Sequence, residues 1–300
     1  MSSFLTYGDW QRLNVRLDRV YCRPVLPQYR QYRNARRNGW SFWIVKRGRI
    51  RIHWDRDHEA VALPGQVMQP PPLPARVHDF SEDAELLSVR WLADWSIGLP
   101  LFEQSKALVF PLSQYPELIE QSHQLSDAYS DIFESFEQKK VPVQMSLAQW
   151  PRLEQCFFRW IEYWINMMVT EGMTVNRPEI LDPRVHHAIR LIQGIQVNGP
   201  VPYGQLCRAT ELSRVQLDRL FRRYLGLTPK DYLNQCIFNR VADEIFANRL
   251  TCAEISEMFG FSSQSHFSRW FQNMTRLTPL QYRKSHLVFN QRFESLIWGE

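Results

Sequence analysis

Apolar and polar residues alternate along several short stretches in the first third of the chain. Every second residue of Arg49–Trp54 is apolar, and Glu85–Leu92 alternates in the same way. A period of two places one set of side chains on each face of a strand. The apolar run Trp40–Val45 comes shortly before, and the prolines of 70–74 favour a loop because proline has no amide donor. Short strands separated by turns predict a sandwich or jelly-roll barrel over about residues 15–95.

From about residue 114 the apolar spacing changes to three and four, which is typical of helices. One helix begins at Tyr115-Pro116, and a second spans Leu147–Thr170 before Gly172–Leu181, which we interpret as a linker. The segment 114–171 has more aromatic residues than one small barrel needs to cover, so we expect it to form a homodimer. These aromatic residues are Phe133, Phe136, Phe157, Trp160 and Trp164. The alternative is that all five pack on the barrel.

The last part of the chain contains an internal repeat. Ser213–Tyr232 and Ser263–Tyr282 align at an offset of 50, with identical residues at seven of twenty positions. Each copy predicts a short helix, a turn, and a second helix that begins at a serine cap. This is the helix-turn-helix arrangement, present twice, at about 205–225 and 252–275, with a long helix between the copies.

The solvent-facing side of each second helix carries side chains that can read base edges or bind phosphate. Arginine pairs with guanine or phosphate, glutamine pairs with adenine, and serine pairs with either. The candidate DNA-binding residues are Arg214, Val215, Asp218, Arg219 and Arg222 in the first copy, and Gln264, Ser265, His266, Ser268, Arg269 and Gln272 in the second. The alternative is a helical hairpin repeat whose polar faces are only hydrated.

The charge distribution favours DNA as the partner of the repeat. Residues 1–182 carry 21 basic and 22 acidic residues, whereas residues 183–300 carry 15 and 9. A basic excess is expected where a protein meets a polyanion. The composition is globular, and no apolar stretch of about 18 residues or secretion signal occurs, so we expect no membrane contact. Five scattered cysteines without a C-x-x-C pair fit the cytoplasm.

The segment Gly260–Arg269, followed by Phe271 and Leu277–Arg283, resembles the signature of the AraC/XylS family of bacterial transcription regulators. The resemblance covers about residues 182–284. It implies a seven-helix DNA-binding domain over 182–300, with operator DNA and RNA polymerase as partners. Glu211 departs from the family pattern, because glycine is common at this position.

The stretch Gly65–His78, followed by Glu85–Leu92, resembles the second half of a cupin barrel, as in sugar-responsive relatives. The resemblance implies a cupin-like sensor over 1–113, including an N-terminal arm, that binds a sugar or a sugar derivative as its effector. Tryptophan offers a flat platform, and arginine or histidine can bind hydroxyl or carboxylate groups. The candidate pocket residues are Arg33, Trp40, Trp43, Arg76, His78, Ser88 and Arg90.

No cofactor and no metal are expected. Arg76 stands where a cupin metal site needs a histidine, and the histidines of the barrel lack the His-x-His spacing of that site. No Ser-His-Asp set, P-loop or dinucleotide-binding fingerprint occurs, so no catalytic residue is predicted.

The fold class predicted is multi-domain, with an N-terminal β-barrel plus helices and a C-terminal all-α double helix-turn-helix. The function predicted is a transcription regulator of a catabolic, carbohydrate-related operon, and not an enzyme. One alternative is a ligand-independent regulator whose barrel serves only for dimerisation. The other is a cupin enzyme fused to a DNA-binding domain, which would carry a stoichiometric metal.

Overall fold

The computed structural model describes residues 6–25, 27, 30–34, 39–54, 58–72, 76–95, 98–137, 145–177, 182–247, 249–275 and 277–287. Its contacts divide the chain into two compact units that separate after Asn176, inside the predicted linker. The N-terminal unit contains antiparallel sheets with helices, and the C-terminal unit is all-α. The predicted fold class is therefore confirmed.

Two antiparallel sheets form the body of the N-terminal unit. The larger sheet has the strand order β1-β8-β3-β6-β10, and the smaller has the order β2-β7-β4-β5. The strands of the larger sheet are β1 (Leu13–Pro24), β8 (Glu85–Trp95), β3 (Trp40–Arg47), β6 (Gln66–Gln69) and β10 (Leu108–Pro111). Those of the smaller sheet are β2 (Gln31–Asn34), β7 (Arg76–Phe80), β4 (Ile50–Trp54) and β5 (His58–Ala62).

Apolar side chains from both sheets meet in one core. Trp43 of β3, Met68 of β6 and Ile52 of β4 belong to this cluster and are at most 3% exposed. The alternation predicted for β4 is confirmed, since Ile50, Ile52 and Trp54 are buried while Arg51 and His53 between them are partly exposed.

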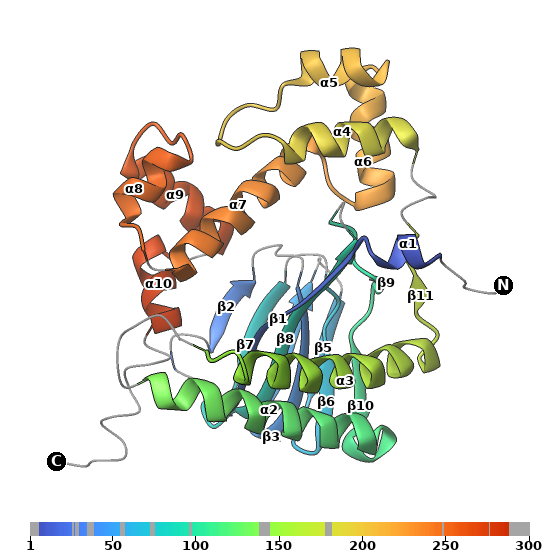
Figure 1. Ribbon diagram of the computed structural model, residues 1–300, viewed down its shortest axis with the longest axis vertical. Coiled ribbons are helices and arrows are strands. Elements are labelled where there is room, and N and C mark those ends of the chain that lie inside the picture. Colours follow the sequence, from blue (N-terminus) through green and yellow to red (C-terminus); the bar gives the residue numbers. More distant parts are fainter. Residues whose placement is uncertain are drawn as a thin grey trace. The chain divides into compact units, whose positions relative to one another are not determined.

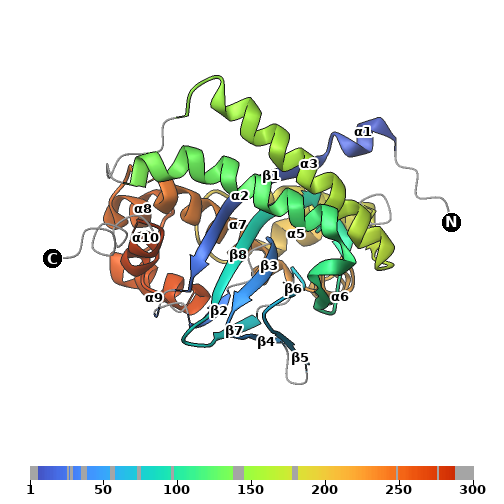
Figure 2. The same ribbon diagram turned by 90° about the horizontal axis from the view of Figure 1, so that it is seen from below.

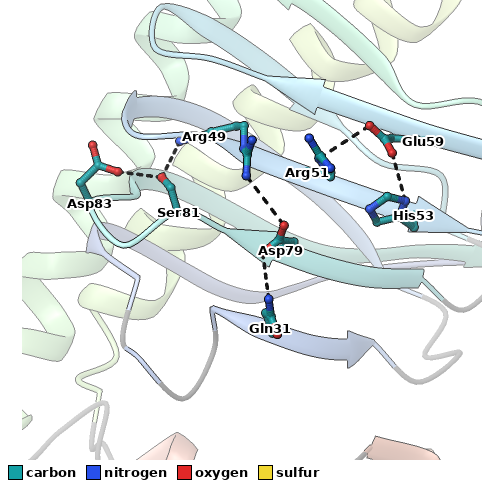
Figure 3. A network of polar contacts seen from close by, with 8 residues as sticks. All are labelled: Gln31, Arg49, Arg51, His53, Glu59, Asp79, Ser81 and Asp83. Atoms are coloured by element: carbon teal, nitrogen blue, oxygen red, sulfur yellow. Dashed lines mark hydrogen bonds and ion pairs between the residues drawn. The ribbon is translucent and has the colours of Figure 1, made fainter.

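The outer face of the smaller sheet is polar. Figure 3 shows Arg49 beside Asp79, and Arg51 and His53 on either side of Glu59. The ion pairs measure 3.9 Å from Arg49 to Asp79, 3.6 Å from Arg51 to Glu59 and 3.3 Å from His53 to Glu59. Because these side chains are solvent-exposed, each pair contributes at most about 1 kcal/mol to stability. Their main effect is to keep this face hydrated.

Helices cover the outer face of the larger sheet instead. A short helix, α1 (Tyr7–Trp10), precedes β1, and a 3-10 turn, η2 (Leu112–Gln114), precedes α2 (Pro116–Glu137) and α3 (Gln149–Thr170). Figures 1 and 2 both show α2 and α3 lying along this sheet. Strand β3 is consequently buried on both faces over six successive residues.

Four tryptophans form the contact between α3 and the sheet. The ring centroid of Trp91 lies 4.5 Å from that of Trp160 and 4.9 Å from that of Trp164, and Trp40 lies 5.1 Å from Trp164. All four side chains are fully buried. Edge-to-face rings at these separations add to the stabilisation that burial itself provides.

This packing corrects one expectation about the aromatic residues of 114–171. Phe157, Trp160 and Trp164 are fully buried within the unit, so they are not available to a partner subunit. The side chains of Phe133 and Phe136 lie outside the described residues. The part of α3 that faces solvent carries other apolar side chains, namely Trp150 (59% exposed), Phe158 (52%) and Val169 (58%).

The chain that leaves α3 is tied back to the N-terminal unit. Strand β11 (Thr174–Val175) pairs antiparallel with β9 (Phe102–Glu103). Asn176 then donates from its backbone amide to the Leu101 carbonyl at 2.8 Å and from its side chain to the Pro100 carbonyl at 2.9 Å. The first part of the predicted linker is therefore structured.

Seven helices make up the described part of the C-terminal unit. They are α4 (Pro183–Gln193), α5 (Tyr203–Thr210), α6 (Arg214–Leu225), α7 (Pro229–Ala247), α8 (Cys252–Met258), α9 (Gln264–Thr275) and α10 (Pro279–Leu287). Helix α4 begins at the predicted cap, because the Asp182 side chain accepts from the Arg184 amide at 2.9 Å. Along the described stretches of the chain, no helix is long and apolar enough to cross a membrane.

Candidate functional site

Helices α5 and α6 form the first helix-turn-helix. Ser213 caps α6 through a capping box, in which its hydroxyl accepts from the Gln216 amide and the Gln216 side chain accepts from the Ser213 amide. Leu217 and Phe221 are fully buried, so the opposite side of α6 faces solvent. The turn before α6 contains Glu211 with a φ of 55°, the left-handed region that favours glycine.

The solvent-facing side of α6 carries the five candidate residues. Arg214, Arg219 and Arg222 are exposed, Val215 is 77% exposed, and Asp218 is half-buried. Three cations and one apolar side chain therefore surround a single carboxylate. Such a face can bind phosphates through arginine and contact base edges with the shorter side chains.

Tyr203, the first residue of α5, contacts two of these residues. The Arg214 guanidinium lies over the Tyr203 ring, with 4.2 Å from Cζ to the ring centroid. The Tyr203 hydroxyl donates to Asp218 Oδ1 at 3.1 Å. Burial raises the pKa of Tyr203, and its hydrogen bond to Asp218 raises it further, so the phenol remains a donor at neutral pH. Sequence reasoning missed Tyr203, because it lies on the preceding helix and outside the aligned repeat.

Helices α8 and α9 form the second helix-turn-helix. The turn between them contains Gly260 with a φ of 68°, which has the same left-handed conformation as Glu211 in the first motif. A side chain at this position would place its Cβ 3.1 Å from the Cβ of Val197. Ser263 caps α9 by accepting from the His266 amide at 3.1 Å, as the sequence predicted.

A shallow, open hollow of about 430 Å³ runs along the solvent-facing side of α9. Five of the six candidate residues of the second copy line it, namely Gln264, Ser265, Ser268, Arg269 and Gln272. His266 is placed differently, because its Nδ1 lies 3.0 Å from the Ser262 hydroxyl and its ring packs edge-on against Phe261. Among the residues that line the hollow, Arg269 is the charged one.

The segment after α4 connects the two helix-turn-helix motifs. Figure 1 shows α7 running between them. Arg240 of α7 donates to the carbonyls of Ile195, at 2.6 Å, and Gln193. The Asn198 amide donates to the Phe259 carbonyl at the end of α8, at 2.7 Å. These hydrogen bonds tie the segment between α4 and α5 to α7 and to the end of α8.

Comparison with known proteins agrees with this arrangement. A family model described as "Helix-turn-helix domain" matches residues 206–285. The chain is 28% identical over 108 residues to the HTH-type transcriptional regulator ArgR of Pseudomonas aeruginosa, which covers 36% of this chain and 32% of that protein. It is 30% identical over 89 residues to the Msm operon regulatory protein of Streptococcus mutans, with coverage of 30% and 32%. Residues 206–285 form a helix-turn-helix domain similar to those of these regulators.

These matches span about a third of each relative, so they concern the helix-turn-helix domain and not the whole chain. A solved structure of ToxT from Vibrio cholerae, with an unsaturated fatty acid bound, is similar over 91% of this chain and 95% of that one. At 12% identity and a TM-score of 0.55, this likeness shows the two-domain fold alone.

The interior of the N-terminal unit brings together most of the candidate pocket residues. In the pairing of β3 with β8, Trp43 lies opposite Ser88, and Ser41 lies opposite Arg90. Directly opposed residues share a face of a sheet, so these side chains point toward the core between the sheets. His78 of the smaller sheet lies against Trp43, with ring centroids 5.0 Å apart.

Arg76 and His78 are buried together in this interior, at 2% and 0% exposure. Arg76 Nε donates to His78 Nε2 at 3.0 Å, and its other nitrogens donate to the Pro71 carbonyl and, at 3.4 Å, to the Ser41 hydroxyl. Burial, followed by the charges of Arg76 and Arg90, holds the pKa of His78 well below 6.5. His78 is therefore neutral and accepts a hydrogen bond from Arg76.

The remaining two candidates are not seen in this group. Trp40 lies in the layer between the larger sheet and α3, where its indole donates to the Ala93 carbonyl at 3.3 Å. The structure therefore does not bring Trp40 to the His78 group. The backbone of Arg33 pairs with Val77, and its side chain lies outside the described residues. Arg90 forms an ion pair of 2.9 Å with Asp18 of β1.

Proposed function

We propose that the chain is a sequence-specific, DNA-binding transcription regulator that acts in the cytoplasm. The observation that supports this most is the pair of exposed faces, on α6 and α9, that one C-terminal unit presents. Each face combines arginine with side chains that read base edges. The relatives of the helix-turn-helix domain are themselves named as transcriptional regulators. Contact with RNA polymerase stays a prediction.

Each protomer is proposed to occupy two successive major-groove segments about 10 bp apart on one side of the duplex. Helix α7 has 19 residues, which corresponds to about 28 Å at 1.5 Å per residue. This length is close to one turn of DNA, about 34–36 Å, so a rigid spacer of this kind suits two adjacent grooves.

DNA selection followed by fluorescence anisotropy at fixed salt tests this function. Arg219→Ala and Arg269→Ala should each weaken binding of a selected operator by about 1–3 kcal/mol if the arginine reads a base. Arg47→Ala, which removes an exposed arginine from the end of β3, is the matched control and should bind normally. Wild-type affinity in both test variants would contradict the assignment of these faces.

We further propose that the N-terminal unit is a cupin-like sensor whose interior binds a small polar effector. The expected ligand is a sugar or a sugar derivative that reports on a carbohydrate-related operon. Trp43 supplies a flat apolar surface beside His78, and Arg76 supplies positive charge at the same group, while the charge of Arg90 is paired with Asp18. This charge favours derivatives with a carboxylate or a phosphate over neutral sugars. The rival is a ligand-independent regulator.

A thermal-shift screen of the full chain separates these alternatives. The panel contains monosaccharides, uronic acids and sugar phosphates, with an unsaturated fatty acid included because ToxT is known with one bound. A sugar derivative that stabilises the wild type but not the His78→Gln variant would support the proposed site. A screen in which no compound raises the melting temperature would favour the ligand-independent regulator.

The chain is also proposed to form a homodimer through the solvent-facing side of α3. Trp150, Phe158 and Val169 are all more than half exposed along this helix, and a partner subunit would remove these apolar side chains from water. Light scattering at micromolar concentration should give twice the chain mass for the wild type and a smaller mass for Phe158→Asp. A wild-type monomer would refute the proposal.

We propose no enzymatic activity. Within the described parts of the chain, no group of three or more His, Cys, Asp or Glu side chains is placed to hold a metal ion. Metal analysis of the purified protein tests this directly, since a stoichiometric transition metal would favour the cupin-enzyme alternative.

A further inference from the structure

Two of the five candidate residues on α6 share one partner. Arg214 and Asp218 are four residues apart, so they lie one above the other on the same side of the helix. Tyr203 contacts both at once, with its ring under the guanidinium and its hydroxyl on the carboxylate. The three side chains form a compact group, which we call the Tyr203 group, at the start of the first recognition helix.

The second helix-turn-helix has no counterpart to this group. Gln264 and Ser268 align with Arg214 and Asp218 at the offset of 50, and Cys252 is the first residue of α8 as Tyr203 is of α5. None of them carries a charge at neutral pH or an aromatic ring. The Tyr203 group is therefore a property of the first copy and not of the shared helix-turn-helix framework.

A carboxylate on a DNA-binding face is unfavourable unless it makes a specific contact with a base. DNA phosphates repel the Asp218 carboxylate, whereas they attract the neighbouring Arg214, Arg219 and Arg222. In the major groove, however, an aspartate can accept a hydrogen bond from the N4 amino group of cytosine, and this contact distinguishes cytosine from the other bases. The bond from Tyr203 occupies Oδ1 of Asp218, and a carboxylate has a second oxygen that can accept from a base.

Tyr203 also fixes the direction in which Asp218 points. A side chain that is already held in its binding conformation loses less freedom when DNA binds. The capping box at Ser213 and Gln216 fixes the start of α6 in the same region. The Arg214 stack adds a cation beside the carboxylate, which lowers the electrostatic cost of bringing Asp218 close to DNA.

We propose that Asp218 reads a cytosine amino group in the major groove and that Tyr203 is the positioning residue that holds it in place. This inference rests on the proposed DNA-binding function. It identifies the first helix-turn-helix as the source of preference for a G·C pair at one position of the operator.

The test compares base preferences selected from a random DNA library by the wild type and by conservative variants. Asp218→Asn keeps the size of the side chain, and asparagine pairs with adenine, so the preference at one position should change from cytosine to adenine. Tyr203→Phe keeps the ring under Arg214 and removes only the hydroxyl. This variant should bind the operator with cytosine roughly three- to tenfold more weakly. The ratio between its affinity for that operator and its affinity for operators with another base at this position should also fall.

Two further variants show whether the effect passes through Asp218. In the Asp218→Asn background, adding Tyr203→Phe should cause no further loss for the cytosine operator, because the ionised acceptor is already absent. Tyr224→Phe is the matched control, because this substitution also removes a tyrosine hydroxyl, but elsewhere on α6. The Tyr224 ring lies near an arginine as well, with 5.6 Å from Arg223 Cζ to the ring centroid. It should select the wild-type sequence with wild-type affinity.

The outcomes separate this inference from the proposed function. If the wild type selects no sequence, the proposed function fails. If the wild type selects an operator and Asp218→Asn leaves every position of it unchanged, Asp218 does not read a base and this inference is overturned alone. If Tyr203→Phe binds with unchanged affinity and discrimination, the positioning role of Tyr203 is wrong.

Discussion

Replacing Glu211 by glycine should stabilise the first helix-turn-helix. Glu211 is the non-glycine residue with positive φ in the described part of the chain, at 55°. Holding a residue with a Cβ in the left-handed region costs about 1–2 kcal/mol. Glycine avoids this cost. It also increases the conformational entropy of the unfolded chain, which offsets about 0.4–1 kcal/mol of the gain in stability.

Glu211→Ala is the control that isolates the backbone effect. Both substitutions remove the Glu211 carboxylate. The pKa of Arg184 is raised mainly by Asp182 and to a smaller extent by Glu211, so both variants lose the same small electrostatic effect. The alanine variant keeps the Cβ and therefore keeps the strain. The glycine variant should be more stable than the alanine variant by about 1 kcal/mol, the difference between the two opposing contributions.

Hydrogen exchange measured by mass spectrometry on the full chain gives the required local resolution. Amides of α5 and α6 exchange through openings whose free energy includes the turn between them. A difference of about 1 kcal/mol slows their exchange roughly fivefold in the glycine variant relative to the alanine variant. Equal exchange in the two variants, or faster exchange with glycine, would show that the turn is not strained at Glu211.

Two other predictions use the same measurements. Gly260→Ala should destabilise the second helix-turn-helix by more than about 1 kcal/mol, because it adds a Cβ 3.1 Å from Val197 at a φ of 68°. Hydrogen exchange in α8 and α9 should therefore accelerate, and exchange as slow as in the wild type would contradict this. The N-terminal unit should lose stability as pH falls below about 6.5, because unfolded His78 takes up a proton that the folded state excludes, by at most about 1.4 kcal/mol per pH unit. Urea titrations at pH 7.0 and 5.5 check this, and a His78→Asn variant that shows the same pH dependence as the wild type would refute it.

The sequence identified those parts of the fold whose pattern repeats or alternates. The two helix-turn-helix motifs could be predicted because their capping serines, Ser213 and Ser263, recur at a fixed offset with the same apolar stripe. Strand β4 was predictable because only one of its faces is buried. In each case a local rule and the tertiary structure agree.

Other features depend on contacts that no local pattern contains. Strand β3 is apolar on both sides, so its pattern could not show that Trp40 faces α3 while Trp43 faces the other sheet. The stripe of α3 predicted an apolar surface, and only the structure shows that this chain's own sheet covers Trp160 and Trp164. Tyr203 gave no signal, since its contacts with α6 depend on the angle between two helices.

The hydrogen bonds of Arg240 and Asn198, which tie the segment between α4 and α5 to α7 and α8, would limit how operators can vary if the chain binds DNA as proposed. Two recognition helices on a flexible tether could follow a site whose halves move apart, because the tether would absorb the change. When the helices belong to one braced body, an inserted base pair rotates the second segment by about 35° and moves it away from its helix. The number of base pairs between the two segments is then as fixed as their sequence. The proposed binding mode therefore predicts operators that diverge by substitution within each segment, but not by insertion or deletion between them.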